Sequence, residues 1–490
     1  MKKISFLFIV VCLSLSAQAI VPPRSLADTV GYNRQVRLMQ KASGMQAPMR
    51  EQAVGVRKTF LRVPVILVNY PDMSYRIDRA DVDSMFNAVN YIKDGATGSV
   101  RQYFYDQSYG EYNPQFDIYG PVTVSQNYAH YAERASELVL EACALMDDSL
   151  DFTLYNLDGN TKVDLVYCLY AGPPASDGDY IDRSWISNPS QLIWPHYWVI
   201  SEAGSYKKPT VFDGLTIEDY EVSSELDGMY SSATEAVLAG VGLACHEFGH
   251  GLGLPDLYPT GQSTHNGKTS GVWDIMDYGC YNNDGKTPSA YSAYERWFMD
   301  WLEPTLLNSA STDTLPAIGS SPKAFYMTES GNAVSDILSP TPNVFYLMEN
   351  RQNTGWDAYL PGHGMLITKI TYDATKWQNN TVNANKNNLG IDILEADGLT
   401  PSAGSSGGLG KPGDTYPTGS TSFTKVANYQ VTEIAEANGV ITFKVNGGGT
   451  PTELDTQETG ALSKPRKILR DGRVVILRGE KEYDILGRVL

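Results

Sequence analysis

The sequence predicts an α+β fold with much irregular structure, a long central helix and a β-rich C-terminal region. Short β-branched runs alternate with turn residues, and one central segment has helical periodicity. The chain also has 31 tyrosines, 44 glycines and 26 prolines, which favour short strands joined by turns and loops. With 490 residues, 42% of them hydrophobic, it is long enough for more than one domain.

The charge balance limits the classes of partner. The formal net charge is −18, and the sequence contains no cluster of Lys and Arg. Nucleic-acid binding requires a basic face to neutralise phosphates. We therefore expect protein or peptide partners and no nucleic acid.

The first residues predict export. Lys2 and Lys3 precede an apolar stretch at 4–16, and Ala17-Gln18-Ala19 has the small residues of a signal-peptide cleavage site. We expect residues 1–19 to be removed as a signal peptide, which predicts a secreted, extracellular or cell-surface protein. The apolar stretch is shorter than the roughly 20 residues of a membrane-spanning helix, so no membrane span is expected.

A polar stretch at 20–58 precedes the first strong core element and predicts a pro-segment. The catalytic part is expected over 59–310. It begins with FLRVPVILVNY at 60–70, whose nearly continuous apolar run is typical of a strand buried on both faces. Further strands are predicted at 115–124 and 163–170, with a helix at 132–146.

The central helix is predicted over 233–252. Ser231 and Ser232 are its candidate N-caps, and the run Gly251-Leu252-Gly253 is expected to end it.

The chain becomes β-rich after about residue 310. Residues 311–446 are expected to form a β-rich C-terminal part of the same unit, followed by a Gly/Thr/Glu linker at 447–466 and a small hairpin at 467–490 with Asp471-Gly472 as its turn. The strands predicted within the β-rich part are 344–349, 364–371, 390–394 and 440–445.

Four cysteines remain after the signal peptide, Cys143, Cys168, Cys245 and Cys280. A chain of this length does not need disulfides for stability, so we expect buried small side chains, with disulfide pairing as the alternative.

The stretch CHEFGHGLGLPDLY at 245–258 predicts a zinc site. His246 and His250 are four residues apart, so on a helix both imidazoles project from the same face. Zinc bound there lowers the pKa of a bound water, and Glu247 is placed to act as general base on that water and to return the proton to a leaving amine.

A catalytic zinc takes three protein ligands. Gly253 can adopt positive φ and turn the chain back towards the metal, so Asp256 is the expected third ligand. The alternative is a carboxylate farther along the chain, for which Asp274, Asp277 and Glu295 are the candidates.

The string His-Glu-x-x-His-x-x-Gly-x-x-Asp resembles the M6 family of metalloproteases, the immune inhibitor A-like peptidases. The segments VPVILVNYPD, GSVRQYFYDQSYGEY, IWPHYW, YSAYERWFMDWL and YLMENRQNTGWDAYLPGHGMLI extend the resemblance over roughly residues 60–440. It implies a metzincin-like zinc protease domain with a mixed sheet and an active-site helix, in which Met276 is similar to the methionine below the zinc. The C-terminal KEYDILGRVL resembles sorting signals of Bacteroidetes-type secreted proteins, with a plain hairpin as the alternative.

The hypothesis at this stage is a secreted zinc metalloendopeptidase made as a zymogen, with metal ligands His246, His250 and Asp256 and with Glu247 as catalytic base. The alternatives are an inactive surface binding protein on a protease scaffold and a zinc amidase acting on a non-protein substrate. Three weaker signals remain. Residues 156–164 predict a calcium loop, with a plain polar turn as the alternative. Tyr278 or Tyr281 is a candidate oxyanion-stabilising tyrosine, and His196 is a candidate substrate contact, with a structural role as the alternative.

Overall fold

The computed structural model describes residues 19–20, 22, 24, 57–157, 159–203, 210–260, 269–385, 387–399, 409–449 and three strands within 466–483. The predicted leader before Ala19, most of the predicted pro-segment and most of the predicted linker lie outside the described residues.

The fold is mixed α/β, with several sheets and few helices. Its largest sheet has six strands in the order β1-β5-β8-β4-β2-β3. The strands β3, β2, β4 and β8 are parallel, whereas β5 runs antiparallel to β8 and β1 antiparallel to β5. The bounds are β1 Ala19–Ile20, β2 Arg62–Asn69, β3 Gln115–Thr123, β4 Val166–Tyr170, β5 His196–Val199 and β8 Asp219–Ser224.

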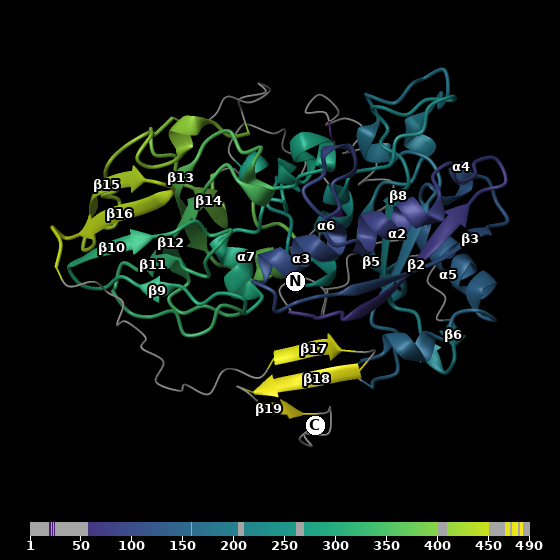
Figure 1. Cartoon of the computed structure of the whole chain (residues 1–490), viewed down its shortest axis with the longest axis horizontal. Coiled ribbons are helices and arrows are strands. Elements are labelled where there is room, and N and C mark those ends of the chain that lie inside the picture. Colours follow the sequence, from purple (N-terminus) through teal and green to yellow (C-terminus); the bar gives the residue numbers. More distant parts are fainter. Residues whose placement is uncertain are drawn as a thin grey trace, which may run out of the picture.

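Helices cover both faces of this sheet (Figure 1). The side chains of β2 alternate between two cores: Val65 and Leu67 belong to the core shared with α2, α3 and α6, and Ile66 and Val68 to the core shared with α5. Six of the eight residues of β2 are buried, so the prediction of a strand covered on both faces is confirmed. The bounds of these helices are α2 Arg79–Asn87, α3 Val100–Gln107, α5 Ala135–Met146 and α6 Val241–Gly251.

The β-rich C-terminal region contains a five-stranded sheet in the order β14-β13-β12-β11-β9 and a three-stranded sheet β10-β16-β15. The predicted strands at 364–371 and 440–445 are found with those bounds. The strands are β9 Thr305–Leu306, β10 Ser311–Leu315, β11 Phe325–Met327, β12 Val344–Arg351, β13 Gly364–Thr371, β14 Ile391–Ile393, β15 Val431–Ala437 and β16 Val440–Val445.

The smaller elements complete the inventory. The hairpin β6-β7 stands apart from the main sheet, and β17, β18 and β19 form an antiparallel sheet below the two larger parts in Figure 1. Arg470 pairs with Arg473 across β17 and β18. The bounds are α4 Tyr128–Tyr131, α7 Ala293–Phe298, α8 Ala374–Gln378, β6 Val211–Phe212, β7 Leu215–Thr216, β17 Arg466–Arg470, β18 Arg473–Arg478 and β19 Lys481–Tyr483.

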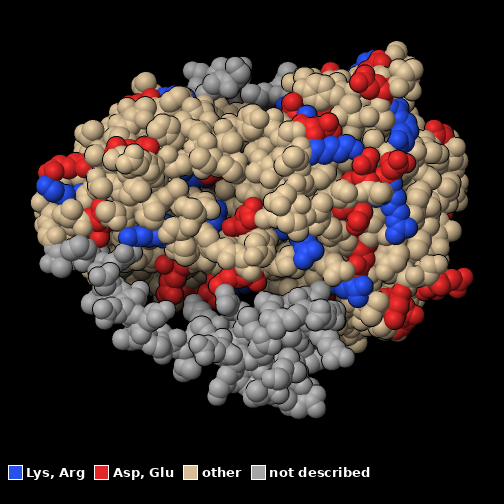
Figure 2. All heavy atoms as spheres, in the orientation of Figure 1, with Lys and Arg blue, Asp and Glu red and all other residues tan. Residues whose placement is uncertain are grey.

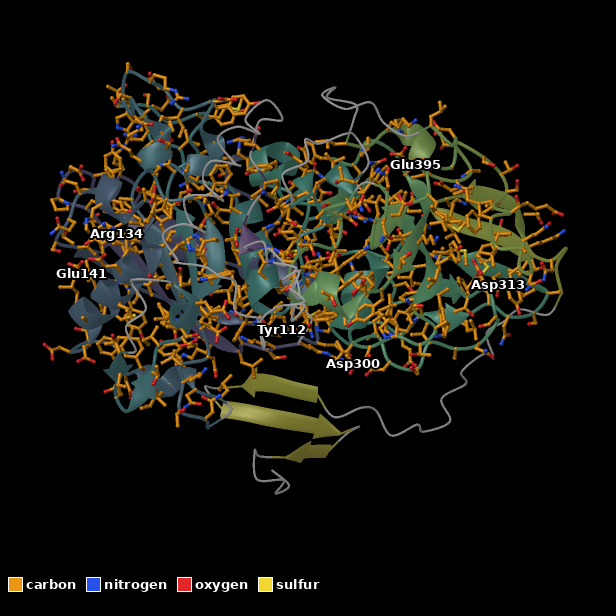
Figure 3. The ribbon with its side chains drawn as sticks, turned by 180° about the vertical axis from the view of Figure 1, so that it is seen from behind. Tyr112, Arg134, Glu141, Asp300, Asp313 and Glu395 are labelled. Atoms are coloured by element: carbon orange, nitrogen blue, oxygen red, sulfur yellow. The ribbon has the colours of Figure 1, made fainter. Side chains whose placement is uncertain are left out.

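The β-rich region is joined to the first sheet by shared packing. In Figure 3, Tyr112 and Asp300 lie towards the middle of the molecule, between Arg134 at one end and Asp313 at the other. The Tyr112 ring stacks on Trp301 with the ring centroids 5.6 Å apart. One continuous core contains residues of α6 and of β12 to β14, so the β-rich region shares a core with the helix that carries the histidines.

The predicted start of the central helix was wrong. Helix α6 begins at Val241, eight residues later than expected. The segment before it pairs with backbone instead: Ala239 N donates to Glu225 O, and Asp227 N donates to Val237 O. Ser231 and Ser232 therefore cap no helix. The hydroxyl of Ser231 accepts from Val237 N, and that of Ser232 accepts from Glu235 N.

All four cysteines are buried free thiols, which confirms the expectation of small buried side chains. No helix among the described residues has the length and apolarity needed to cross a membrane. On the face shown in Figure 2, acidic and basic side chains are interspersed.

Candidate metal centre

Helix α6 brings the two predicted histidines together. Their ring centroids are 4.7 Å apart, and the two Nε2 atoms are 3.1 Å apart. Both side chains are fully buried. This is the geometry expected of residues four apart on one helix face.

Backbone carbonyls fix the tautomer of each ring. His246 Nδ1 lies 2.7 Å from Ile275 O, and His250 Nδ1 lies 2.8 Å from Leu254 O. A carbonyl oxygen can only accept, so each Nδ1 carries the proton and donates it. Each neutral ring therefore presents its Nε2 lone pair to the space between the two histidines.

Asp256 completes this group. Its Oδ1 lies 3.3 Å from His246 Nε2 and 3.1 Å from His250 Nε2. Gly253 ends the helical turn at φ 107°, a conformation that favours glycine, and so allows the chain to return towards the histidines. Among the described residues, His246, His250 and Asp256 form a group whose ligand atoms all lie within 4.8 Å of one another.

Asn380, at the end of α8, holds Asp256 in this orientation. Its side-chain amide donates to Asp256 Oδ2 at 2.5 Å, and its Oδ1 accepts from Asp256 N at 2.7 Å. Only Oδ1 is left for the histidines. Such a partner fixes the direction of a ligand and raises its affinity for a metal.

The donor set fits a divalent cation such as zinc. Three atoms with lone pairs face one another with side-chain exposures of 0%, and Asp256 Oδ1 has no hydrogen-bond partner among the described residues. Burial holds the pKa of His246 below its ordinary value despite the nearby Asp256 carboxylate, so a shared proton is disfavoured there. Tetrahedral zinc with bonds of about 2.1 Å separates its ligands by about 3.4 Å, close to the separations found here.

Glu247 lies on the same turn of α6 and is fully buried. It directly follows His246 in the sequence and lies between the two histidines on the helix. A side chain in this position can accept a proton from a water at the centre.

The loop beneath the histidines carries Met276. A Cβ atom added at Gly249 would lie 2.8 Å from Met276 Sδ, so the absence of a side chain at Gly249 lets the methionine approach the helix. The backbone of this loop is anchored by Leu257 N, which donates to Met276 O at 2.8 Å, and by the bond from His246 to Ile275 O.

The alternative third ligands are engaged elsewhere. Asp274 accepts from Met276 N, Asp277 from Tyr278 N and Glu295 from Ser292 N. None of the three belongs to the metal-ligand group. Burial raises the pKa of each carboxyl, consistent with a structural network rather than a cation site.

The structure gives the calcium loop, His196 and Tyr281 structural contacts of their own. The calcium prediction at 156–164 gains no support, because Asn156 Nδ2 donates to Asn160 O and Leu157 N donates to Asp164 Oδ2, as in a self-bonded turn. Asp158 lies outside the described residues. His196 is a structural histidine between Trp194 O and Tyr220 OH, and Tyr281 OH donates to Pro22 O.

Sequence reasoning missed Asn380 as a site residue. It lies 124 positions after Asp256 and follows another asparagine in a polar stretch, so no local signal distinguishes it. Tyr258 was also missed, although it is part of the motif region. Its ring is stacked on His246 with the centroids 6.5 Å apart.

Comparison with known proteins finds a family match over the segment that contains these residues. Residues 189–303 match the family described as immune inhibitor A peptidase M6, catalytic domain, and this range contains both histidines, Asp256 and Met276. Immune inhibitor A of Bacillus thuringiensis subsp. alesti is 26% identical over 307 residues, which cover 52% of this chain and 41% of that protein.

A second relative is the pre-pro-metalloprotease PrtV of Vibrio cholerae serotype O1 (strain M66-2). It is 24% identical over 293 residues, which cover 50% of this chain and 30% of that protein. The matched region thus spans less than half the length of either relative. Over these regions the chain is similar to the M6 family of metalloproteases.

Proposed function

We propose that the chain is a secreted zinc-dependent endopeptidase, made as a latent precursor. The observation that carries the proposal is the buried convergence of His246 Nε2, His250 Nε2 and Asp256 Oδ1, with Glu247 on the same helical turn. The name of one relative, pre-pro-metalloprotease PrtV, supports a peptidase made with a leader and a pro-segment.

His246, His250 and Asp256 would hold the metal, and Asn380 would keep Asp256 in place. A zinc ion bound there supplies a Lewis acid that polarises a carbonyl and acidifies a water molecule. Glu247 would then act as the general base that removes a proton from the attacking water and passes it to the nitrogen of the leaving amine. A carboxylate suits both tasks because it can accept and release the same proton within one catalytic cycle.

The burial of the centre supports a latent precursor. His246, Glu247, His250 and Asp256 are all 0% exposed in the whole chain, so a peptide cannot reach them without a change in what covers them. We therefore propose that residues 20–58 are a pro-segment whose cleavage precedes activity. We also propose the domain limits 59–310, 311–446, 447–466 and 467–490. The proposal includes export by the signal peptide at 1–19 and a sorting role for the C-terminal sheet.

The test is hydrolysis of casein by the full-length chain after zinc loading and limited proteolysis of its N-terminal segment. A trace of trypsin performs the limited proteolysis, and the Glu247→Gln variant is treated in the same way. This variant should lose about a hundredfold or more of the activity because the general base is gone. It should still bind one zinc per chain, whereas His246→Ala should not.

Glu235→Gln is the matched control. It makes the same chemical change at an exposed glutamate shortly before α6, and its activity should equal that of the wild-type chain. Full activity in Glu247→Gln contradicts the proposed mechanism. Zinc binding with no hydrolysis of any substrate indicates an inactive binding protein, and hydrolysis confined to non-peptide amides indicates an amidase.

A further inference from the structure

A pocket of three carboxylates, two of them buried, lies one layer of side chains away from the metal centre and holds a side chain from the N-terminal segment. Arg24 Nη1 lies 2.8 Å from Asp227 Oδ1 and 3.2 Å from Asp177 Oδ2, and its Nη2 lies 3.2 Å from Asp284 Oδ1. The Arg24 side chain is only 8% exposed. The faces of two tyrosine rings complete the pocket, with the guanidinium carbon 5.8 Å from the Tyr230 centroid and 6.0 Å from the Tyr281 centroid.

The pocket is built from the body of the protein. Gly228 N donates to Asp177 Oδ2 at 2.9 Å, and Met229 N donates to Asp227 Oδ1 at 2.9 Å. Tyr230 OH donates to Asp284 Oδ2 at 2.9 Å. Backbone amides and a hydroxyl thus hold the three carboxylates towards one point, as is required for recognition of a guanidinium by more than one acceptor.

The pocket requires a cation. Asp177 and Asp227 are nearly fully buried, and Asp177 Oδ1 has no hydrogen-bond partner among the described residues. Burial raises the pKa of Asp177 to about 6 even with Arg24 beside it, and Asp227 acts in the same direction. Two adjacent buried carboxylates without a positive partner are unfavourable, so the departure of Arg24 would leave a site that attracts another cation.

The backbone around Arg24 is bound in the way that an extended peptide is bound. Ile20 pairs antiparallel with His196 of β5, and Ala19, the last residue of the predicted leader, pairs with Tyr197. Strand β5 borders the rest of the sheet on that side. Pro22 O accepts from Tyr281 OH at 2.6 Å, and Arg24 N donates to Ser176 O at 3.0 Å. Addition of a strand to a sheet edge, with side-chain pockets for specificity, is a general mode of peptide recognition.

One layer of side chains connects this pocket to the metal ligands. Tyr281 packs against a cluster that contains Leu243 of α6 and Tyr258. Leu243 precedes His246 by three residues on the same helix, and Tyr258 stacks on the His246 ring. Strand β1 also contacts α6. The pocket is therefore placed to receive a residue of the same peptide that is cut at the metal.

We propose that Asp177, Asp227 and Asp284 form a substrate subsite for a basic side chain, arginine in preference to lysine, which Arg24 occupies in the full-length chain. This inference rests on the proposed endopeptidase function. The predicted leader cleavage after Ala19 leaves Arg24 in the exported chain, so the subsite is filled until the N-terminal segment is displaced. Arginine is preferred because its planar fork donates to several carboxylates at once, whereas a lysine ammonium is a single point of charge.

The first experiment measures ligand binding in the full-length chain without relying on catalysis. Arg24→Ala empties the pocket, and it is combined with Glu247→Gln, which prevents self-cleavage. Thermal unfolding of this double variant is then followed in the presence of millimolar N-acetyl-arginine amide or N-acetyl-citrulline amide. Citrulline has nearly the same shape as arginine but no charge. We expect the arginine amide to raise the Tm by several degrees, and neither ligand to change the Tm of the Glu247→Gln parent, whose pocket is filled.

Adding Asp227→Asn to the Arg24→Ala chain should abolish the shift. Arg24→Gln, which retains most of the length of the side chain, provides the same test if the alanine variant does not fold. Absence of a shift with the arginine amide in a folded Arg24 variant overturns the pocket as a guanidinium site.

The second experiment uses Arg24→Ala with Glu247 intact, loaded with zinc and activated by limited proteolysis of its N-terminal segment. It compares matched peptides that carry arginine or citrulline at each position around the cut. We expect at least a tenfold higher kcat/KM for arginine at one fixed position, and loss of that preference in Asp227→Asn. A Tm shift without any arginine preference overturns the role as a substrate subsite. A Tm shift with no hydrolysis of any peptide supports the pocket and contradicts the endopeptidase function.

Discussion

Asn380 makes two hydrogen bonds to Asp256, one to the side-chain Oδ2 and one from the backbone N, although the two residues lie 124 positions apart. This contact links the segment that follows α8, in the β-rich region, to the candidate metal centre. It aims the free oxygen, Oδ1, at both histidines. Asn380 therefore holds the carboxylate that we propose as the third metal ligand.

We expect Asn380→Gly to lower zinc affinity by about ten- to hundredfold, the usual effect of losing an outer partner of a metal ligand. Glycine is the appropriate replacement because Asn380 has φ 52°, which glycine adopts without strain. Competition with a chelator of known affinity measures the change. Asn438→Gly, at the same φ of 52° in the turn between β15 and β16, is the control and should bind zinc normally.

The local part of the site could be predicted from the sequence. Helical spacing alone places His246 and His250 on one face, and the positive φ of Gly253 explains how Asp256 returns to them. The strand β2 was equally predictable, because a strand buried on both faces requires a continuous apolar run. In each case the information lies within one element or one turn.

The remainder depends on contacts between distant segments. The stretch before α6 has helical periodicity in sequence, yet Leu238 forms a β-bridge with Leu226, so tertiary pairing overrides the local preference. The Arg24 pocket collects carboxylates from three separate loops, at positions 177, 227 and 284. No periodic pattern along the chain predicts either arrangement.

Removal of the metal is expected to destabilise the protein as well as inactivate it. An ion that binds only the folded state stabilises it by about 4 kcal/mol when present at a thousand times its Kd. Without a cation, three buried acceptor atoms face one another. Thermal unfolding of Glu247→Gln with zinc and with a chelator should show a lower Tm after chelation, and the same comparison in His246→Ala should show little difference. An unchanged Tm in Glu247→Gln would argue against a resident metal.

Gly242 is expected to be required for the placement of α6. A Cβ atom there would lie 1.9 Å from Cys280 O and 3.1 Å from Gly285 O, both of which are backbone atoms. We expect Gly242→Ala to lower the free energy of unfolding by about 2–4 kcal/mol, because the helix must move away from the turn after Met276. Gly319→Ala, where an added Cβ has no neighbour within 4 Å, should be close to neutral. Urea unfolding measures both variants, and equal stabilities would contradict the close contact.

The buried His196 is expected to make the fold sensitive to mild acid. Its Nδ1 donates to Trp194 O at 2.7 Å, so its Nε2 accepts from Tyr220 OH at 3.1 Å, and protonation would place a second N–H against that hydroxyl. Burial lowers the pKa of His196 from 6.5 to about 4. Between these two values the unfolded chain binds the proton and the folded chain does not, so stability falls as the pH falls.

From pH 7 to pH 5 this one group should lower the free energy of unfolding by about 2 kcal/mol. His196→Gln cannot titrate, so urea unfolding at the two pH values should show a loss smaller by about that amount in the variant than in the wild-type chain. The exposed His363 remains in both proteins and cancels from the comparison. Equal losses in both proteins would mean that His196 accepts a proton in the folded state as readily as in the unfolded one.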